Sequence, residues 1–470
     1  MASARRVGHR SSRSGSSHSD AGGRDRGAKV TANGNGRLFG TDGVRGLANS
    51  ELTADLAFGL AQAAGDGHEG HVVIGRDTRR SSPMFASALA AGFNSVGIDS
   101  VDLGIIPVGG VSRLVRDTGA ILGVMVSASH NPAQDNGIKF FAQDGTKLPD
   151  EAEDAIEARL TSGRSYSRPI GPAVGIQTTM TDAIDRYVEK IARPIQYSMR
   201  GLEFAIDCAN GASFAAAPQL LEQVGATFTI FADMPNGMNI NKNCGATHPE
   251  YLAERARGTV GFAFDGDADR LIAVDEDGAV VNGDVIMAIF ARWQKERGKL
   301  KNNTVVVTVM SNLGFRLAME RLGIQVVETR VGDRYVLDAM RSSRAVVGGE
   351  QSGHVLLEDR TTGDGLRTSL RVMEVMASTG RELRELRTVM EEFPQVLQNV
   401  VVGDKAGLVG NAAITAAIDE GERSLAGRGR ILVRPSGTEP LVRVMVEAPS
   451  EGEAAGVADA IADVVHTELG

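Results

Sequence analysis

The chain has 470 residues, a formal net charge of −9 and two cysteines. Its length predicts roughly three or four domains of about 100–150 residues each. The acidic balance disfavours nucleic acid as a partner. Two cysteines give a chain of this size no disulfide framework, which favours a reducing cytoplasm. The sequence has no run of about 18 apolar residues, so we expect no transmembrane helix and no membrane partner.

Residues 1–36 are rich in Ser, Gly and Arg and poor in apolar residues. Such a segment can bury too little apolar surface to fold, so we expect a disordered tail. It lacks the apolar stretch of a secretory signal. The folded part of the chain is therefore expected to begin near Arg37.

A unit of strand, helix and strand recurs three times along the chain. Each helix is expected to end at a glycine that forms a left-handed C-terminal cap, namely Gly97, Gly225 and Gly323. The flanking strands are expected at residues 72–75 and 98–103, at 204–208 and 227–231, and at 305–309 and 325–328. This succession predicts parallel strand pairs in three related, mixed α/β domains.

The C-terminal segment has a different pattern. Strands are expected at residues 431–433 and 441–447, followed by a helix at about 451–469. These elements predict a smaller α+β domain. After the tail at 1–36, the predicted domains are residues 37–190, 191–298, 299–395 and 396–470.

The first polar motif, SASHNP at 127–132, follows a predicted buried strand at 122–126. Polar side chains at the end of a parallel strand lie where α/β folds bind ligands. Asn-Pro breaks the chain, so the serine is expected in a tight, exposed turn. Together with His130 and Lys139, this serine suits nucleophilic or phosphoryl-transfer chemistry. A plain polar turn remains the alternative.

Three aspartates at alternate positions, Asp265, Asp267 and Asp269, lie between two short apolar runs. A hairpin would bring their carboxylates together, and such close like charges repel one another unless a cation lies between them. Oxygen ligands without a nearby Cys or His favour a hard ion such as Mg²⁺ over zinc. An EF-hand is rejected because Arg270 stands where its turn needs Gly. A solvated acidic turn remains the alternative.

Two further loops carry groups that suit a sugar phosphate. Residues 348–354, GGEQSGH, combine backbone amides with a carboxylate, a hydroxyl and an imidazole, which fit the hydroxyl and amine groups of a sugar. Residues 434–440, RPSGTEP, and Arg443 after them offer two guanidiniums and two hydroxyls around a glycine turn. That second set suits a phosphate dianion, although an ordinary surface turn remains the alternative.

Six motifs together resemble those of the α-D-phosphohexomutases. In chain order they are FGTDGVRG at 39–46, SASHNP at 127–132, DNGIKFF at 135–141, DGDADR at 265–270, GEQSGH at 349–354 and RPSGTEP at 434–440. The resemblance implies four domains around a central cleft, with one motif from each. One departure is PVGG at 107–110, where many relatives read TPTPA.

The resemblance implies roles at the reaction centre. Ser129 is expected to carry a phosphate and, with that phosphate, to join Asp265, Asp267 and Asp269 in binding one Mg²⁺ per active site. Three cationic or titratable groups are expected to stabilise charge or move the proton: Arg45, Lys139 and His354. Which of these three moves the proton stays open.

The resemblance also implies which residues bind the substrate. Glu350 and Ser352 are expected to contact the sugar. The non-reacting phosphate is expected to be held by Arg434, Ser436, Gly437, Thr438 and Arg443.

The implied enzyme is a phosphosugar mutase that works through a phosphoserine and a sugar 1,6-bisphosphate. Gln351 in GEQSGH is typical of the bacterial branch acting on glucosamine 6-phosphate and glucosamine 1-phosphate, which feeds UDP-N-acetylglucosamine synthesis. Mannose- and glucose-directed relatives usually read GEMSGH. The expected partners are the amino-sugar phosphate and a priming kinase or sugar 1,6-bisphosphate, and a homodimer stays open.

Two alternatives are set against this prediction. The first is a phosphoglucomutase or phosphomannomutase, because one glutamine is thin evidence for a substrate. The second is a non-catalytic sensor of sugar phosphates that keeps the fold, which the intact Ser129, Lys139 and aspartates argue against.

Overall fold

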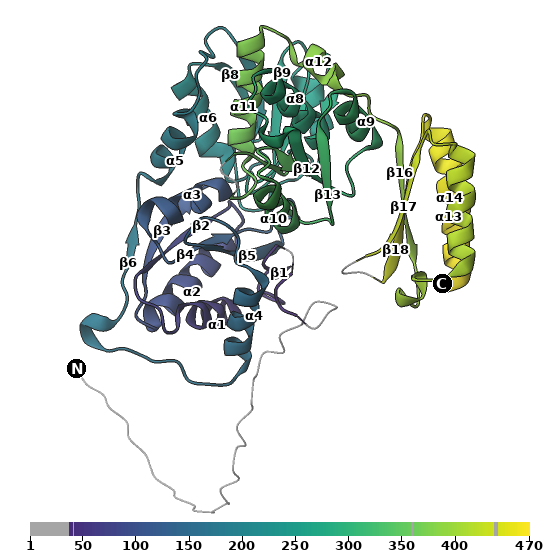
Figure 1. Ribbon diagram of the computed structural model, residues 1–470. Helices are drawn as coiled ribbons and strands as arrows, with labels where there is room; N and C mark the ends of the chain where they lie inside the picture. The colour runs from purple at the N-terminus through teal and green to yellow at the C-terminus, as the bar shows by residue number, and fades with distance from the viewer. Residues whose placement is uncertain (1–36, 41, 359–360, 437–439) are drawn as a thin grey trace, which may run out of the picture. The chain divides into compact units, whose positions relative to one another are not determined.

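The computed structural model describes residues 37–40, 42–358, 361–436 and 440–470 (Figure 1). The predictions made for the tail at 1–36 and for Gly437 and Thr438 lie outside these residues. The described chain forms four β-sheets in succession, each with its own helices. None of the helices in these described ranges is long and apolar enough to cross a membrane.

The first sheet has the strand order β1-β5-β4-β2-β3-β6. Its strands are β1 Val44–Leu47, β2 His71–Arg76, β3 Asp99–Ile105, β4 Leu122–Val126, β5 Asp135–Ala142 and β6 Gln177–Thr179. Its helices are α1 Ala54–Gly65, α2 Ser82–Ser95, α3 Val108–Thr118, α4 Asp150–Thr161 and α5 Ala183–Ala192. β2 pairs in parallel with β3, as predicted, whereas β5 runs antiparallel to β4 and β1.

Helices cover both faces of this sheet because side chains alternate along a strand. On β2, Val72 and Ile74 pack into a core cluster that contains residues of α1 and α2. Val73 packs into a second cluster that contains residues of α3 and α5. The result is a three-layer α/β/α arrangement, and it places the turn between β4 and β5 at one edge of the layers.

The second sheet has the strand order β11-β10-β9-β7-β8. Its strands are β7 Glu203–Asp207, β8 Thr227–Phe231, β9 Val260–Phe264, β10 Leu271–Val274 and β11 Val280–Val281. Its helices are α6 Ser213–Val224 and α7 Pro249–Arg255. β7 and β8 are parallel, as predicted, and β9 and β10 form an antiparallel hairpin around the aspartate motif.

The third sheet has the strand order β13-β12-β14-β15. Its strands are β12 Thr304–Thr308, β13 Gln325–Thr329, β14 Gly348–Gly349 and β15 Val355–Leu356. Its helices are α8 Gly283–Glu296, α9 Leu313–Arg321, α10 Asp333–Ser343, α11 Gly365–Thr379 and α12 Leu383–Leu386. β12 and β13 are parallel, which confirms the third predicted pair. The GEQSGH motif forms the turn between the antiparallel strands β14 and β15.

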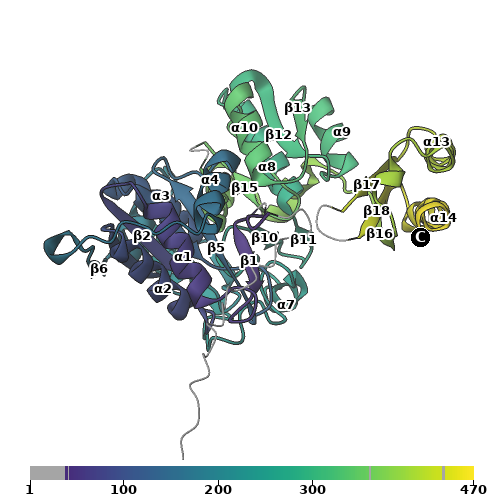
Figure 2. The same cartoon turned by 90° about the horizontal axis from the view of Figure 1, so that it is seen from below.

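The fourth sheet is antiparallel, with the order β16-β18-β17. Its strands are β16 Gln395–Val401, β17 Arg430–Pro435 and β18 Leu441–Glu447, and its helices are α13 Ala412–Leu425 and α14 Glu451–Leu469. Figure 2 shows both helices beside one face of this sheet. Val442, Val444 and Val446 point into the core that β18 shares with α14. The predicted α+β domain is therefore confirmed.

The predicted glycine caps are present. Gly225 ends α6 with φ at +77°, and Gly97 and Gly323 have φ at +90° and +62° just past α2 and α9.

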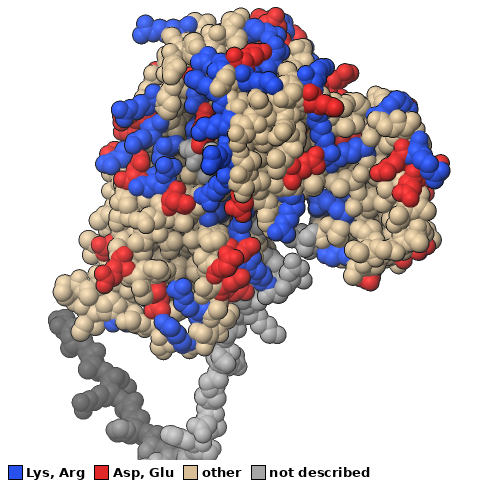
Figure 3. Space-filling model, viewed as in Figure 1, with Lys and Arg blue, Asp and Glu red and all other residues tan. Residues whose placement is uncertain are grey.

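On the face drawn in Figure 3, basic and acidic side chains are interspersed.

Candidate active site

The serine motif forms the turn between β4 and β5 of the first sheet. Ser129 has φ at +52°, in the left-handed region, and is 1% exposed. The prediction of an exposed turn is therefore wrong. The side chain is covered because the aspartate hairpin of the second sheet packs directly against this turn, which the sequence pattern around the serine does not reveal.

The Ser129 hydroxyl points at the aspartates. Its Oγ donates to Asp265 Oδ2 at 2.5 Å and lies 3.5 Å from Asp269 Oδ1. The neighbouring His130 Nδ1 is 3.3 Å from the same oxygen. Burial, followed by the nearby cations Arg270 and Arg45, lowers the pKa of His130 to about 4. An uncharged imidazole and a carboxylate thus flank the hydroxyl.

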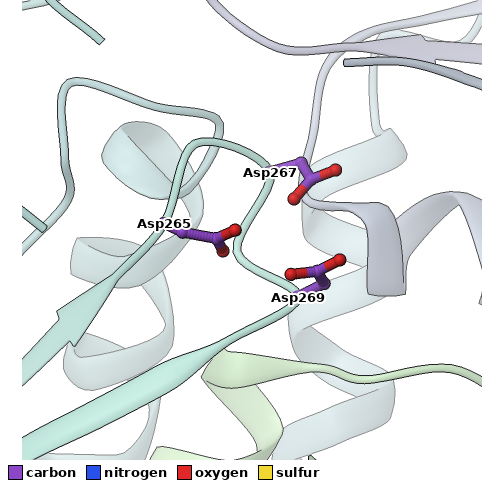
Figure 4. A group of neighbouring side chains, drawn as sticks. All are labelled: Asp265, Asp267 and Asp269. Carbon is purple, nitrogen blue, oxygen red and sulfur yellow. The ribbon is translucent and has the colours of Figure 1, made fainter. Parts of the chain in front are cut away.

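The three aspartates converge in the turn between β9 and β10, and Figure 4 shows their carboxylates arranged around a common centre. A carboxylate oxygen of each lies within 4.8 Å of one from each of the others, and all three residues are buried. Burial, then the charges of Asp269 and Asp267, raise the pKa of Asp265 well above its usual value. Asp267 Oδ1 is buried and has no hydrogen-bond partner among the described residues.

These aspartates fit a hard divalent cation. A divalent cation binds several oxygen ligands that lie close to one another, whereas the carboxylates of a solvated turn would be exposed to water. These carboxylates are buried, and one of their oxygens has no partner among the described residues. The described part of the structure therefore contains a buried cluster of carboxylates suited to binding a metal ion, beside a serine hydroxyl.

Lys139 on β5 supplies positive charge to the same cluster. Its Nζ lies 2.9 Å from Asp267 Oδ2, 3.4 Å from Asp269 Oδ2 and 3.0 Å from Asp42 Oδ2. Burial alone would lower the pKa of Lys139, but the surrounding carboxylates outweigh it and raise that pKa. A lysine that is 1% exposed is therefore held as a cation among the aspartates.

Arg45 and His354 also reach this centre, from the first and third sheets. Arg45 Nη1 donates to Asn131 Oδ1 at 3.1 Å, and its guanidinium pairs with Asp42. His354 Nδ1 lies 3.7 Å from Asp269 Oδ2. Burial would lower the pKa of His354, but its contacts with Asp269 and Asp333 raise it to about 10.

Three charged residues of this network were not singled out from the sequence. Asp42 contacts Arg45, Lys139 and Lys147, while Lys147 Nζ lies 2.7 Å from Asp333 Oδ2. Asp333 in turn lies 3.5 Å from His354 Nε2. The position of Asp42 inside the FGTDGVRG motif was the one available signal; nothing in the sequence pattern distinguishes Lys147 or Asp333.

The GEQSGH turn lies against the aspartate hairpin. The Leu271 amide of β10 donates to the Gly353 carbonyl at 3.0 Å. Glu350 Oε1 accepts from the Gly332 amide at 3.0 Å, and Ser352 Oγ lies 3.4 Å from Glu350 Oε2. Glu350 is thus oriented by its own loop and by the start of α10.

The RPSGTEP motif of the fourth sheet begins at the end of β17. Arg434 and Arg443 are direct cross-strand partners. Burial, followed by the Arg443 charge, lowers the pKa of Arg434. Ser436 is buried, and its amide donates to the Leu441 carbonyl at 2.8 Å. Within the described ranges, no hydrogen bond or ion pair is found that joins Arg434 to the motifs of the first three sheets.

The structure thus brings together predicted site residues from the first three sheets: Ser129 with Lys139 and Arg45, the three aspartates, and His354 with its loop. It also places the PVGG departure against them, because the Val108 amide at the start of α3 donates to the Asp267 carbonyl at 2.9 Å.

Four family models for phosphoglucomutase/phosphomannomutase match the chain. Alpha/beta/alpha domain I matches residues 36–167, domain II 185–278, domain III 282–393 and the C-terminal domain 397–464. The chain belongs to the phosphoglucomutase/phosphomannomutase family, and it is an isomerase with three α/β/α domains and a C-terminal domain.

Within this family the chain groups with the phosphoglucosamine mutases. It is 50% identical over 439 residues to the phosphoglucosamine mutase of Desulforamulus reducens, which covers 91% of this chain and 99% of the relative. Among solved structures, a phosphoglucomutase/phosphomannomutase family protein from Burkholderia thailandensis matches with a TM-score of 0.77 at 24% identity, over 92% of this chain and 97% of that one. The N-acetylphosphoglucosamine mutase of Aspergillus fumigatus, in complex with GlcNAc-6P and magnesium, matches with a TM-score of 0.68 at 20% identity, over 92% of this chain and 96% of the other.

Proposed function

We propose that the chain interconverts glucosamine 6-phosphate and glucosamine 1-phosphate, with Ser129 as the carrier of the transferred phosphate. One observation carries the proposal: a buried serine hydroxyl lies 2.5 Å from a buried carboxylate in a cluster of three. Phosphoryl transfer needs positioning and neutralisation of charge more than covalent chemistry by the protein. The site supplies both.

Asp265, Asp267 and Asp269, with the phosphate on Ser129, would hold one Mg²⁺. The support is Asp267 Oδ1, which has no hydrogen-bond partner in the described ranges, and the magnesium in the fungal relative's structure. Bound there, the ion offsets the phosphate charge and orients the phosphate for in-line transfer. Lys139 pairs with two of the same carboxylates, so it limits their repulsion and remains available beside the transferred group.

The reaction proceeds by two transfers. In the first, a free hydroxyl oxygen of the sugar forms a bond to the phosphorus on Ser129, the bond from Ser129 Oγ to phosphorus breaks, and the proton of the sugar hydroxyl ends on the released Ser129 Oγ. The product is a sugar 1,6-bisphosphate. After this intermediate turns end for end, Ser129 Oγ forms a bond to the phosphorus of the other phosphate, the bond from that phosphorus to the sugar oxygen breaks, and the serine proton ends on that sugar oxygen. Arg45, Lys139 and His354 provide the positive charge that both transfers require.

The two remaining loops hold the sugar at its ends. Glu350 and Ser352 contact the sugar, since their side chains are oriented together in the GEQSGH turn. The non-reacting phosphate binds Arg434, Ser436 and Arg443, with Gly437 and Thr438 of the same loop. Two adjacent guanidiniums of like charge favour a bound dianion. The first phosphate on Ser129 comes from a kinase or from a sugar 1,6-bisphosphate.

Substrate preference is attributed to Glu350 and Gln351. An amine at the sugar C2 needs acceptors, which a carboxylate and an amide oxygen can supply. Buried polar groups left unpaired cost about 1–3 kcal/mol each, or roughly 5- to 150-fold in rate. A phosphoglucomutase or phosphomannomutase is the second candidate, because the family models carry those names.

The test is kcat/KM for glucosamine 6-phosphate, glucose 6-phosphate and mannose 6-phosphate on one preparation, repeated with Gln351→Met. We expect the parent to prefer glucosamine 6-phosphate and the variant to lose part of that preference. Equal values in the parent, or a preference for mannose, would overturn the glucosamine assignment and leave the second candidate.

A further inference from the structure

We propose that Arg79 and Asn241 are positioning residues that clamp the backbone carbonyl of Ser129 from two domains and thereby aim its hydroxyl. The proposal rests on the proposed function, in which Ser129 carries the phosphate. Neither residue belongs to the six motifs.

Arg79, between β2 and α2, makes its contacts almost entirely to the serine turn. Its side chain is fully buried. Nη2 donates to the Ser129 carbonyl at 2.9 Å and to the Asn131 carbonyl at 2.8 Å. Nη1 donates to the Asp135 carbonyl at 3.0 Å and also to the Pro132 carbonyl. One guanidinium thus binds four carbonyls of a single turn.

The Arg79 guanidinium is itself fixed. Its Nε donates to Asp77 Oδ2 at 2.7 Å, and Asp77 is also fully buried. Asp77 Oδ1 accepts from the Ser82 hydroxyl at 2.6 Å. A buried carboxylate that satisfies the charge and orients the plane of the guanidinium leaves Arg79 little freedom to follow a moving turn.

Asn241 reaches the same carbonyls from the second domain. Its Nδ2 donates to the Ser129 carbonyl at 2.9 Å and to the Asn131 carbonyl at 3.1 Å. Its backbone amide donates to the Ala209 carbonyl at 2.9 Å, and Asn241 is buried. Ser129 therefore has two attachments to the second domain: its carbonyl to Asn241 and its hydroxyl to Asp265.

The clamp holds a backbone conformation that a serine seldom adopts. Ser129 has φ at +52°, and such conformations cost on the order of 1–3 kcal/mol unless the surroundings impose them. The aspartate hairpin also packs closely against the Ser129 carbonyl, because a Cβ at Gly266 would lie 2.5 Å from its oxygen. Released from its two donors, the carbonyl would rotate and carry the hydroxyl away from Asp265.

The test compares Asn241→Ala with Asn243→Ala. Asn243 lies two residues away, has φ at +53° against +57° for Asn241, and is exposed, so both alanines incur the same backbone cost. We expect Asn241→Ala to lower kcat by about 100-fold, the loss typical of a reacting group displaced by about 1 Å, with KM for glucosamine 6-phosphate unchanged. Equal kcat in the two variants would overturn the clamp.

A second pair covers the case in which Asn241→Ala fails to fold. Arg79→Ala is compared with the exposed neighbour variant Arg80→Ala, with and without dilute guanidinium. We expect guanidinium to raise the kcat of Arg79→Ala alone, because it can refill the site beside the four carbonyls. No rescue in folded Arg79→Ala would overturn the clamp. The mass of the parent after incubation with a sugar 1,6-bisphosphate tests the proposed function separately, because a parent that then carries no phosphate on Ser129 contradicts that function whatever the variants do.

Discussion

The two ends of the proposed substrate site differ in the charges that their side chains bring together. Around Ser129, hydroxyl, carboxylates and ammonium contact one another at 2.5–3.5 Å and are buried. On the β17–β18 hairpin, Arg434 faces a second guanidinium, that of Arg443, across the strand pair. Like charges directly opposite one another destabilise a sheet.

This difference matches the two tasks. Transfer requires a reacting atom whose position is fixed in advance, since no rearrangement then opposes the reaction. Holding the non-reacting phosphate requires positively charged groups that complement the charge of the dianion. In the proposed function, the first three domains build a preorganised centre for the transfer, and the fourth presents a binding group for either end of the sugar.

The largest effect is expected from Ser129→Ala, which removes the reacting atom from the preorganised end. Because covalent relay leaves no bypass, turnover should be abolished. The fold should remain, since the backbone contacts of Ser129 do not need its hydroxyl. Steady-state rate and thermal unfolding check this, with Ser162→Ala, an exposed serine of the same domain, as the control. More than about a tenth of the parent rate would exclude Ser129 as the obligatory carrier.

Asp267→Asn sharpens the comparison at the same end. It removes one charge and the oxygen that has no described partner, so the Mg²⁺ concentration for half-maximal activity should rise by at least about tenfold while the rate falls. A Mg²⁺ titration measures this, with exposed Asp277→Asn on the same sheet as the control. Overlapping titrations of variant and parent would remove Asp267 from the metal site.

Arg434→Ala tests the opposite end. The phosphate that it holds does not react, so its contact is the same in the ground and transition states and its loss should raise KM more than it lowers kcat. A charged hydrogen bond of about 1.5–3 kcal/mol corresponds to a KM increase of roughly 10- to 150-fold. Exposed Arg423→Ala on α13 is the matched control. A fall in kcat at unchanged KM would place Arg434 at the reaction centre instead.

The smallest effect is expected at the N-terminus. Deleting residues 1–36, which are poor in apolar residues, should leave activity and melting temperature unchanged. Deleting Arg37 as well removes its contacts with Asp150 and Asp154 at 3.1 and 2.6 Å, which should lower stability by at most about 1 kcal/mol. A clear loss of melting temperature in the shorter deletion would show that the segment packs.

The fold was predictable where local pattern decides it. The strands Leu122–Val126 and Leu441–Glu447 and the helix Glu451–Leu469 have the predicted bounds. β16 and α13 of the same domain were missed. Only one residue of β16 is buried, and the strand carries Gln and Asn among its valines, so its apolar pattern is weak. Its pairing with β18 depends on tertiary contact.

Only those residues of the site that belong to a sequence motif could be predicted. Ser129 and Asp265 lie 136 residues apart, and each sits in a recognisable local pattern. Arg79 and Asn241 make their contacts through long-range packing onto backbone carbonyls, which leaves no signature in side-chain spacing. For the same reason the burial of Ser129 was missed, because the hairpin that covers it comes from another domain.

The most direct test of the central claim follows the phosphate itself. The protein is labelled with radioactive phosphate, the label is located by peptide mapping, and excess unlabelled glucosamine 6-phosphate with Mg²⁺ is added. We predict that the label begins on Ser129 and passes into the sugar phosphates at a rate no slower than turnover. Label that stays on the protein while the sugar turns over, or that lies on another residue, would contradict the account.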